Sequence, residues 1–147
     1  MNSDWADLPD APGTYVLLLC GDEPTTIQIN RFGTISLKAG VYAYVGSARG
    51  PGGLRARVRR HMRPVKPIHW HIDTLTALMP VTKVWFEASS ERLECIWARA
   101  LAGLHGISTP VPGFGSSDCA CRSHLFAVPA GSIHTAWEAL GRPAAKP

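Results

Sequence analysis

Five side chains, far apart along the chain, carry the functional groups that phosphodiester hydrolysis needs. They are the phenols of Tyr15 and Tyr44, the guanidinium of Arg57, the imidazole of His61 and the carboxylate of Glu94. A carboxylate suits a hard cation such as Mg²⁺, and such an ion polarises a phosphate and holds the leaving oxygen. A guanidinium gives the phosphate oxygens a permanent planar charge, and a phenol or imidazole can orient or deprotonate the attacking water. These residue types suit metal-assisted hydrolysis if the fold brings them together.

Each of the five also has an ordinary structural role that the sequence leaves open. Tyr15 and Tyr44 could simply pack in a sheet, because tyrosine is favoured in strands, and either phenol could act as a base only if neighbouring positive charge lowered its pKa from about 10. Arg57 could bind phosphate without catalysis. His61 falls within an apolar stripe, which favours a packed, hydrogen-bonded histidine, and Glu94 could be a surface carboxylate paired with an arginine.

The hydrophobic pattern predicts which elements carry these residues. Short apolar or alternating runs bounded by glycine and proline predict strands over residues 15–20, 25–30, 34–37, 41–45, 82–87 and 123–128. Apolar residues recurring every three or four positions predict helices over residues 53–63, 68–79, 91–105 and 133–140. The remaining segments read as an N-terminal arm, a long loop over 108–122 and a Pro/Ala tail. We therefore expect one domain over residues 1–147 of the α/β (α+β) class, with a core about 12–128 and a small mixed or antiparallel sheet flanked by three or four helices.

The helical patterns also predict where the chemical groups point. In the helix 53–63, His61 continues the apolar stripe and Arg57 lies beside it, so both should line the edge of the buried face. In the helix 91–105, Glu94 should lie at the margin of the buried stripe, with the serines at 89 and 90 offering N-cap side chains. A carboxylate at such a margin can reach a cleft without being fully buried.

Positive charge is concentrated in one segment of a chain whose net charge is +4. Its seven basic residues, with no acidic residue among them, are Arg49, Arg55, Arg57, Arg59, Arg60, Arg63 and Lys66. The rest of the chain holds eight basic and eleven acidic residues. A local basic strip predicts contact with the backbone of a nucleic acid, and the alternative is a solvated helix face.

Taken in order, these residues resemble the GIY-YIG nuclease superfamily. The matching segments are Gly13-Thr14-Tyr15, Tyr44-Val45-Gly46, Leu54-Arg55-Ala56-Arg57 followed by His61, and Ser90-Glu91-Arg92-Leu93-Glu94-Cys95-Ile96-Trp97. The resemblance covers roughly residues 12–128 and is greatest to an uncharacterised branch sometimes fused to endonuclease III-type repair enzymes. The tyrosines stand 29 residues apart, farther than the family usually needs, which predicts an added strand or hairpin between them.

The resemblance implies an endonuclease that cleaves DNA, with a role in repair as one expectation. It assigns Glu94 as the ligand of Mg²⁺ or Mn²⁺, and Tyr15, Tyr44, Arg57 and His61 as its catalytic partners. The family's terminal asparagine has no counterpart here, and Asp118 could take its place. The alternative function is a nucleic-acid-binding module that has lost cleavage.

Two further clusters carry metal-binding residue types. Cys119, Cys121 and His124 resemble half a zinc site, for which Cys20, Cys95 or a histidine could complete the four ligands. The alternatives are reduced thiols packed near the sheet, or an interaction domain stabilised by metal at this cluster.

The second cluster is His69-Trp70-His71 with Asp73, which could bind metal only if the segment is extended. A packed tryptophan between hydrogen-bonding histidines, or an aromatic contact to nucleic acid, is the alternative.

The sequence also favours a location in the cytoplasm. It contains no run of 18 apolar residues and no charged start followed by an apolar stretch, so neither a membrane span nor a signal peptide is expected. Cys119 and Cys121 are too close for an ordinary disulfide, which favours a reducing compartment.

Overall fold

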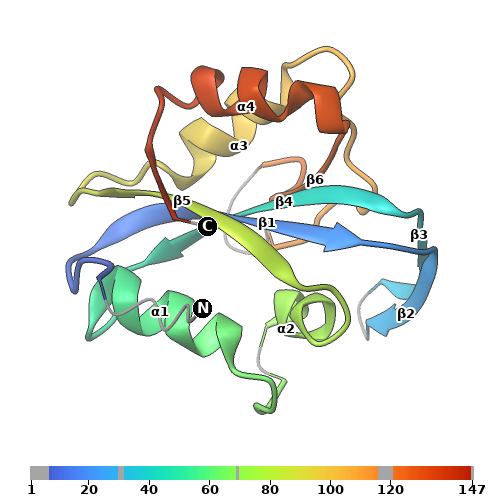
Figure 1. Cartoon of the computed structure of the whole chain (residues 1–147), viewed down its shortest axis with the longest axis horizontal. Coiled ribbons are helices and arrows are strands. Elements are labelled where there is room, and N and C mark those ends of the chain that lie inside the picture. The colour runs from blue at the N-terminus through green and yellow to red at the C-terminus, as the bar shows by residue number, and fades with distance from the viewer. Residues whose placement is uncertain (1–6, 30–31, 69, 116–120, 147) are drawn as a thin grey trace.

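A computed structural model of the chain describes residues 7–29, 32–68, 70–115 and 121–146 (Figure 1). The strands in these ranges are β1 Gly13–Gly21, β2 Thr25–Ile29, β3 Gly33–Leu37, β4 Gly40–Ala48, β5 Val81–Ala88, β6 Leu125–Val128 and β7 Ala144–Lys146. The α-helices are α1 Gly53–Met62, α2 His71–Thr76, α3 Glu94–Ala102 and α4 Ile133–Ala139, and a short 3-10 helix η1, Ala130–Ser132, precedes α4. The predicted α+β class is confirmed.

The central sheet is antiparallel and has the strand order β6-β4-β1-β5-β7. β1 lies at its middle, paired along its length with β4, so that Tyr15 stands opposite Gly46. β2 and β3 pair only with each other and form a separate hairpin. This hairpin is the predicted insertion between the two tyrosine-bearing strands.

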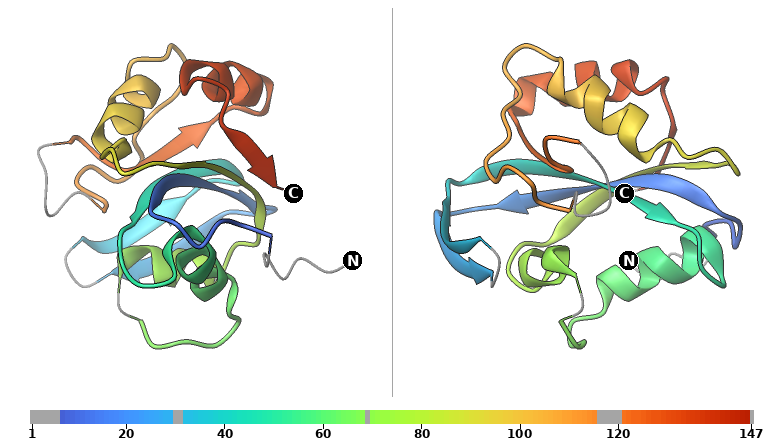
Figure 2. Two further views of the ribbon diagram at one scale, coloured as in Figure 1. Left: turned by 90° about the vertical axis from the view of Figure 1, so that its left-hand side faces the viewer. Right: turned by 180° about the vertical axis from the view of Figure 1, so that it is seen from behind.

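The sheet is the middle of three layers. α1 and α2 cover one face, and α3 and α4 cover the other (Figures 1 and 2). Alternate residues of β1 are buried against opposite layers: Tyr15 and Leu17 pack with the α1/α2 side, whereas Val16 and Leu18 pack with the α3/α4 side. Because side chains alternate along a strand, β4 likewise sends Tyr44 to the α1/α2 side.

The C-terminal segment differs from the predicted irregular tail. Residues 144–146 form β7, which pairs with residues 84–86 of β5 at the edge of the sheet. Lys146 adds an ion pair with Asp7. A short, alanine-rich strand has little side-chain pattern of its own, and it forms because the edge of β5 supplies backbone partners.

α3 begins later than predicted and presents a different face. The hydroxyl of Ser89 accepts a hydrogen bond from the backbone N–H of Glu91 (3.0 Å), so it closes a turn before the helix and does not cap it. Ile96, which the three- and four-residue apolar spacing of the predicted helix 91–105 places in the buried stripe with Leu93 and Trp97, is 57% exposed. The buried residues are Trp97, Ala98 and Leu101, three, four and seven positions after the first residue of the helix. Position 94 therefore lies in line with the buried face rather than at its margin.

α2 is also shorter than its predicted span of 68–79, running for six residues from His71 to Thr76. In the part of the chain that the structure describes, none of the helices is both long and apolar enough to cross a bilayer.

Candidate active site

The five predicted catalytic side chains line one cavity of about 640 Å³, here called the tyrosine groove. The groove lies where the β4–β6 ladder ends, at the pair Tyr44 and Leu125. Its lining residues are Tyr15, Tyr44, Ser47, Arg49, Arg57, His61, Trp70, His71, Ile72, Arg92, Glu94, Cys95, Gly115 and His124. Beyond Leu125, β6 no longer pairs with β4, so β4 forms the edge of the sheet there. Residues of α1 and of α3, which lie on opposite sides of the sheet, both line the cavity at this edge.

Tyr15 and His61 form a hydrogen-bonded pair at the floor of the groove. The phenol oxygen lies 2.7 Å from Nε2 of His61, and both residues are buried. Space for the tyrosine ring comes from Gly46 on the neighbouring strand, where an added Cβ would lie 2.4 Å from Cζ of Tyr15. The glycine of the second tyrosine motif thus makes room for the tyrosine of the first.

The phenols of Tyr15 and Tyr44 and the imidazole of His61 are uncharged at neutral pH. Burial raises the pKa of the Tyr15 and Tyr44 phenols well above its ordinary value, and the opposing effect of Arg57 is smaller. Burial also lowers the pKa of His61 to about 3. Arg57 does lower the pKa of both phenols, but loss of hydration outweighs this attraction, so these contacts do not meet the condition for either phenol to act as a base.

Arg57 is fixed at the wall of the groove by two contacts. Its Nη1 donates a hydrogen bond to the backbone carbonyl of Ser47 (2.9 Å). Its guanidinium carbon lies 4.6 Å from the centre of a Trp70 ring, which is a cation–π distance. These contacts use part of the guanidinium fork, and the side chain still lines the groove.

Arg49 has unsatisfied hydrogen-bonding capacity at the same wall. Its Nη1 donates to the carbonyl of Ser90 (3.0 Å). Its Nε and Nη2 are inaccessible to solvent yet have no hydrogen-bond partner among the described residues. Leaving such charged donors unpaired is costly, so a shift of this side chain toward an anion in the groove would be favourable.

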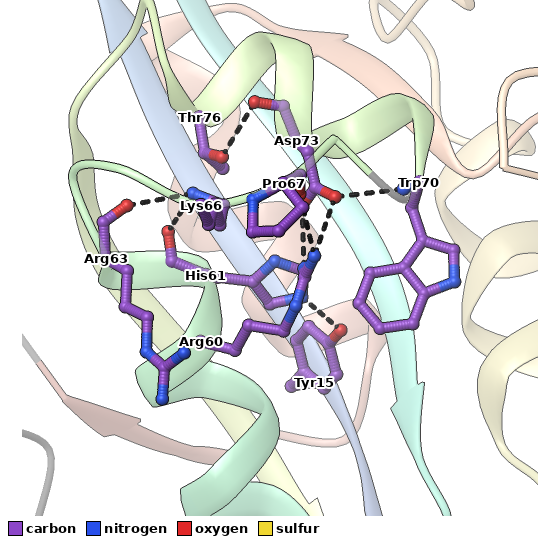
Figure 3. Close-up of polar contacts among 9 residues, drawn as sticks. All are labelled: Tyr15, Arg60, His61, Arg63, Lys66, Pro67, Trp70, Asp73 and Thr76. Atoms are coloured by element: carbon purple, nitrogen blue, oxygen red, sulfur yellow. Dashed lines mark hydrogen bonds and ion pairs between the residues drawn. The ribbon is translucent and has the colours of Figure 1, made fainter.

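Arg60, by contrast, is engaged within the protein. Both of its terminal nitrogens donate to the buried carboxylate of Asp73 (2.9 and 3.1 Å), as Figure 3 shows. Its guanidinium carbon also lies 4.4 Å from the Trp70 ring centre. The Asp73 carboxylate accepts a third bond from the backbone N–H of Trp70 (2.9 Å). This pair secures α2 against α1, so Asp73 serves as an anchor for Arg60.

The remaining basic residues of the strip lie outside the tyrosine groove. Arg55 donates to the carbonyl of Leu8 (2.8 Å), and Lys66 donates to carbonyl groups at the end of α1. Arg59 and Arg63 are exposed. Only two of the seven residues in the strip, at positions 49 and 57, therefore line the groove.

Glu94 enters the groove from the opposite side of the sheet, as the first residue of α3. Its side chain is 30% exposed, and its Oε2 lies 3.1 Å from Nδ1 of His124. Its negative charge is a secondary contribution to the raised pKa of both Tyr15 and Tyr44. It is the sole carboxylate among the described lining residues. A single, partly hydrated carboxylate suits Mg²⁺, which keeps several waters when bound.

Beside Glu94, one ligand atom each from Cys95, Cys121 and His124 lies within 4.8 Å of the other two. The sequence predicted Cys119, Cys121 and His124 as candidate zinc ligands and left the fourth ligand open among Cys20, Cys95 and a histidine. Cys119 and Asp118 lie outside the described residues.

The other predicted metal cluster is only partly described, since His69 lies outside the described residues. His71 lines the groove and makes an edge contact with Phe32, with ring centres 5.0 Å apart.

Sequence reasoning missed Arg92 and Gly115 as lining residues. Arg92 lies outside the basic strip. Its position two residues before Glu94, a candidate metal ligand, is the sequence feature that could have identified it as a lining residue. Gly115 has a positive φ of 72°, and an added Cβ would lie 3.2 Å from Tyr44. No local pattern marks that close approach.

Comparison with known families gives one match. The model of a family described as "Domain of unknown function DUF123" matches residues 14–142. No curated protein and no solved structure matches the chain significantly.

Proposed function

The chain belongs to the DUF123 family of domains of unknown function, and we propose that it is a metal-dependent endonuclease that hydrolyses phosphodiester bonds in DNA. One observation carries the proposal: Tyr15, Tyr44, Arg57, His61 and Glu94, from both sides of the sheet, line one groove. That set is the one implied by the resemblance to GIY-YIG nucleases, and the inserted β2–β3 hairpin accounts for the wide spacing of the tyrosine motifs. A cytoplasmic role in DNA repair belongs to the same proposal.

Arg49 and Arg57 would bind the scissile phosphate. Arg49 has two buried nitrogens without a hydrogen-bond partner among the described residues, and Arg57 is held by Ser47 and Trp70. A guanidinium fork can donate two parallel hydrogen bonds to phosphate oxygens. Because both side chains are anchored, little conformational entropy is lost when a phosphate binds.

Tyr15, Tyr44 and His61 would orient the attacking water as neutral groups. In one tautomer of His61 the Tyr15 phenol donates to Nε2, and its oxygen can accept a hydrogen bond from water. In the other tautomer Nε2–H donates to the phenol oxygen, and the phenol hydrogen is available to the groove. In both cases the short contact fixes the phenol, which limits the positions that a water molecule can take.

Glu94 would hold a Mg²⁺ or Mn²⁺ ion. The ion supplies Lewis-acid polarisation of the phosphate and stabilisation of the leaving oxygen. The carboxylate suits this role because it is partly exposed and lies in line with the buried face of α3, while His124 restrains one of its oxygens.

Plasmid cleavage by the purified chain tests the proposal. We expect nicking with Mg²⁺ and none with a chelator. Arg57→Ala should slow cleavage about 10²–10³-fold, the usual effect of losing one charge-stabilising donor. Arg99→Ala is the control, because Arg99 is exposed and lies outside both the groove and the basic strip. Equal rates for the two variants would reject the site.

A non-catalytic nucleic-acid-binding module is the second candidate. It is favoured by the pKa of His61, about 3, and by the raised phenol pKa values, because neither group is a strong base at neutral pH. Binding of DNA to the wild-type chain without cleavage in either Mg²⁺ or Mn²⁺ would support this candidate.

A further inference from the structure

A cluster of three donor groups lies at the tyrosine groove, and the proposed cleavage involves only His124 of the three, through its contact with Glu94. Cys95 lies in the first turn of α3, whereas Cys121 and His124 lie in the segment just before β6. One ligand atom from each residue falls within 4.8 Å of the other two. Donors from two segments distant in sequence thus converge on a common point, as metal ligands do.

We propose that Cys95, Cys121 and His124 bind a zinc ion. Two thiolates and an imidazole are the ligands that Zn²⁺ prefers, whereas Mg²⁺ and Ca²⁺ take oxygen ligands. The spacing of two residues between Cys121 and His124 lies within the short spacings seen at zinc sites. The zinc site is therefore chemically distinct from the carboxylate site proposed for cleavage, and it does not depend on that proposal.

The observed separations suit a tetrahedral zinc site. With Zn–S of about 2.3 Å and Zn–N of about 2.0 Å, ligand atoms in a tetrahedron stand roughly 3.5–3.8 Å apart. The three ligand atoms here lie within 4.8 Å of one another. Closing the remaining gap takes a shift of at most about 1.3 Å, which rotation of the two half-buried cysteine side chains can supply.

The backbone holds His124 in place for such a role. Its N–H donates to the carbonyl of Phe114 (2.8 Å), and its carbonyl accepts from the N–H of Val45 on β4 (2.9 Å). Gly115 lets the chain pass close to the histidine, since an added Cβ would lie 3.2 Å from Cβ of His124. The imidazole is thus attached to the edge of the sheet and buried, with 2% exposure.

Glu94 adds the acidic neighbour that metal-binding histidines usually have. Its Oε2 lies 3.1 Å from Nδ1 of His124, and a carboxylate in contact with the imidazole orients the ring and raises its basicity as a ligand. Three protein ligands leave the fourth position of the tetrahedron to a water molecule or a further donor. A bound ion would join α3 to the segment before β6 and fix one wall of the groove.

The metal content of the purified, untagged chain tests the zinc site without any measurement of DNA cleavage. We expect about one zinc per chain in the wild type, and a loss of at least tenfold in bound zinc in Cys95→Ser and Cys121→Ser. Cys20→Ser is the matched control, because Cys20 lies on β1 outside the cluster and is similarly half-buried. Wild-type levels of zinc in both cluster variants would overturn the proposal, as would a folded wild-type chain that binds no zinc.

Cobalt substitution gives a second readout that does not require a variant to fold. Co²⁺ in the wild-type site should produce thiolate-to-cobalt charge-transfer absorption in the near ultraviolet and the intense visible bands of tetrahedral coordination. A cobalt spectrum without charge transfer would mean that the cysteines are not ligands, and it would overturn the proposal even if total metal content were high.

Discussion

Tyr15 reaches His61 only because residue 46, directly opposite on β4, has no side chain. A methyl group there would lie 2.4 Å from Cζ and 2.5 Å from the hydroxyl oxygen of Tyr15. The phenol would then have to leave its position, and with it the hydrogen bond of 2.7 Å to His61. In this protein a single hydrogen atom on the strand backbone sets the position of a candidate catalytic group.

Gly46→Ala should therefore cost about 1–3 kcal/mol of unfolding free energy, as overpacking of a core usually does. It should also lower the rate of DNA cleavage by displacing Tyr15. Gly50→Ala is the matched control, because an added Cβ at residue 50 meets no atom within 4 Å. Urea unfolding compares the two variants, and equal midpoints would show that the ring does not occupy the space beside Gly46.

His61 should make stability depend on pH. Its pKa is about 3 in the folded chain and near 6.5 in the unfolded chain, so between these values the unfolded state binds the extra proton. The unfolding free energy should then fall by up to about 1.4 kcal/mol for each pH unit lost below 6.5.

His61→Gln should remove most of that dependence, whatever its effect on stability at pH 7. His105→Gln, at an exposed position, should keep the wild-type slope. Urea unfolding between pH 6.5 and 4.5 measures the slopes. Parallel curves for wild type and His61→Gln would mean that the imidazole is not buried in its neutral form.

At the scale of elements, the sequence pattern predicted the sheet well apart from β7, and it predicted the bounds of α2 and α3 less well than those of α1 and α4. In the predicted strand 41–45, Tyr42 and Tyr44 are two residues apart and so must lie on one face of the sheet, because side chains alternate along a strand; both do pack in the same core cluster. The stripe on α3 was harder to place. Ile96 fits an apolar period as well as Ala98 does, yet it is the exposed one. The elements that pack against a short helix, rather than the spacing of its own apolar residues, decide which face of it is buried.

The candidate site was predictable in its residue types but not in its full membership. Ordered motifs identified Tyr15, Tyr44, Arg57, His61 and Glu94, because hydrolytic chemistry restricts the residue types that can serve. No pattern within the basic strip could show which of its arginines form hydrogen bonds with other parts of the protein and so lie outside the groove. The engagement of Arg60 with buried Asp73 depends on the packing of α2 against α1, which is a tertiary contact.

The strand β7 leads to a prediction about the edge of the sheet. Ending the chain after residue 143 removes the backbone partners of residues 84–86 and uncovers an edge next to Trp85, which is 2% exposed in the intact chain. We expect a lower unfolding temperature and concentration-dependent association, because unpaired edges recruit other strands.

Lys146→Met is the control for that truncation. It removes the ion pair with Asp7 but leaves the β5–β7 ladder in place, and exposed ion pairs contribute little to stability. Thermal unfolding and light scattering compare the two proteins. A truncated chain that melts and scatters like Lys146→Met would show that β7 contributes no more than its terminal ion pair.

For the whole molecule, the three-layer arrangement explains how a site can draw on both faces of a sheet. The phenols and His61 belong to the α1/α2 side, and Glu94 belongs to the α3/α4 side. They share the tyrosine groove because β6 begins at Leu125 and leaves the end of β4 open. The same opening places Arg49 and Arg57 on the wall, so the proposed cation site and the proposed phosphate site would share a single space.

The rate of DNA cleavage in Mg²⁺ by Glu94→Gln, set against Glu91→Gln, tests this account most directly. Glu91 precedes α3 by three residues, is exposed and lies outside the groove. The account predicts that Glu94→Gln loses at least about 10²-fold in rate while remaining folded, and that Glu91→Gln cleaves like the wild type. Cleavage by Glu94→Gln within tenfold of the wild-type rate would contradict it.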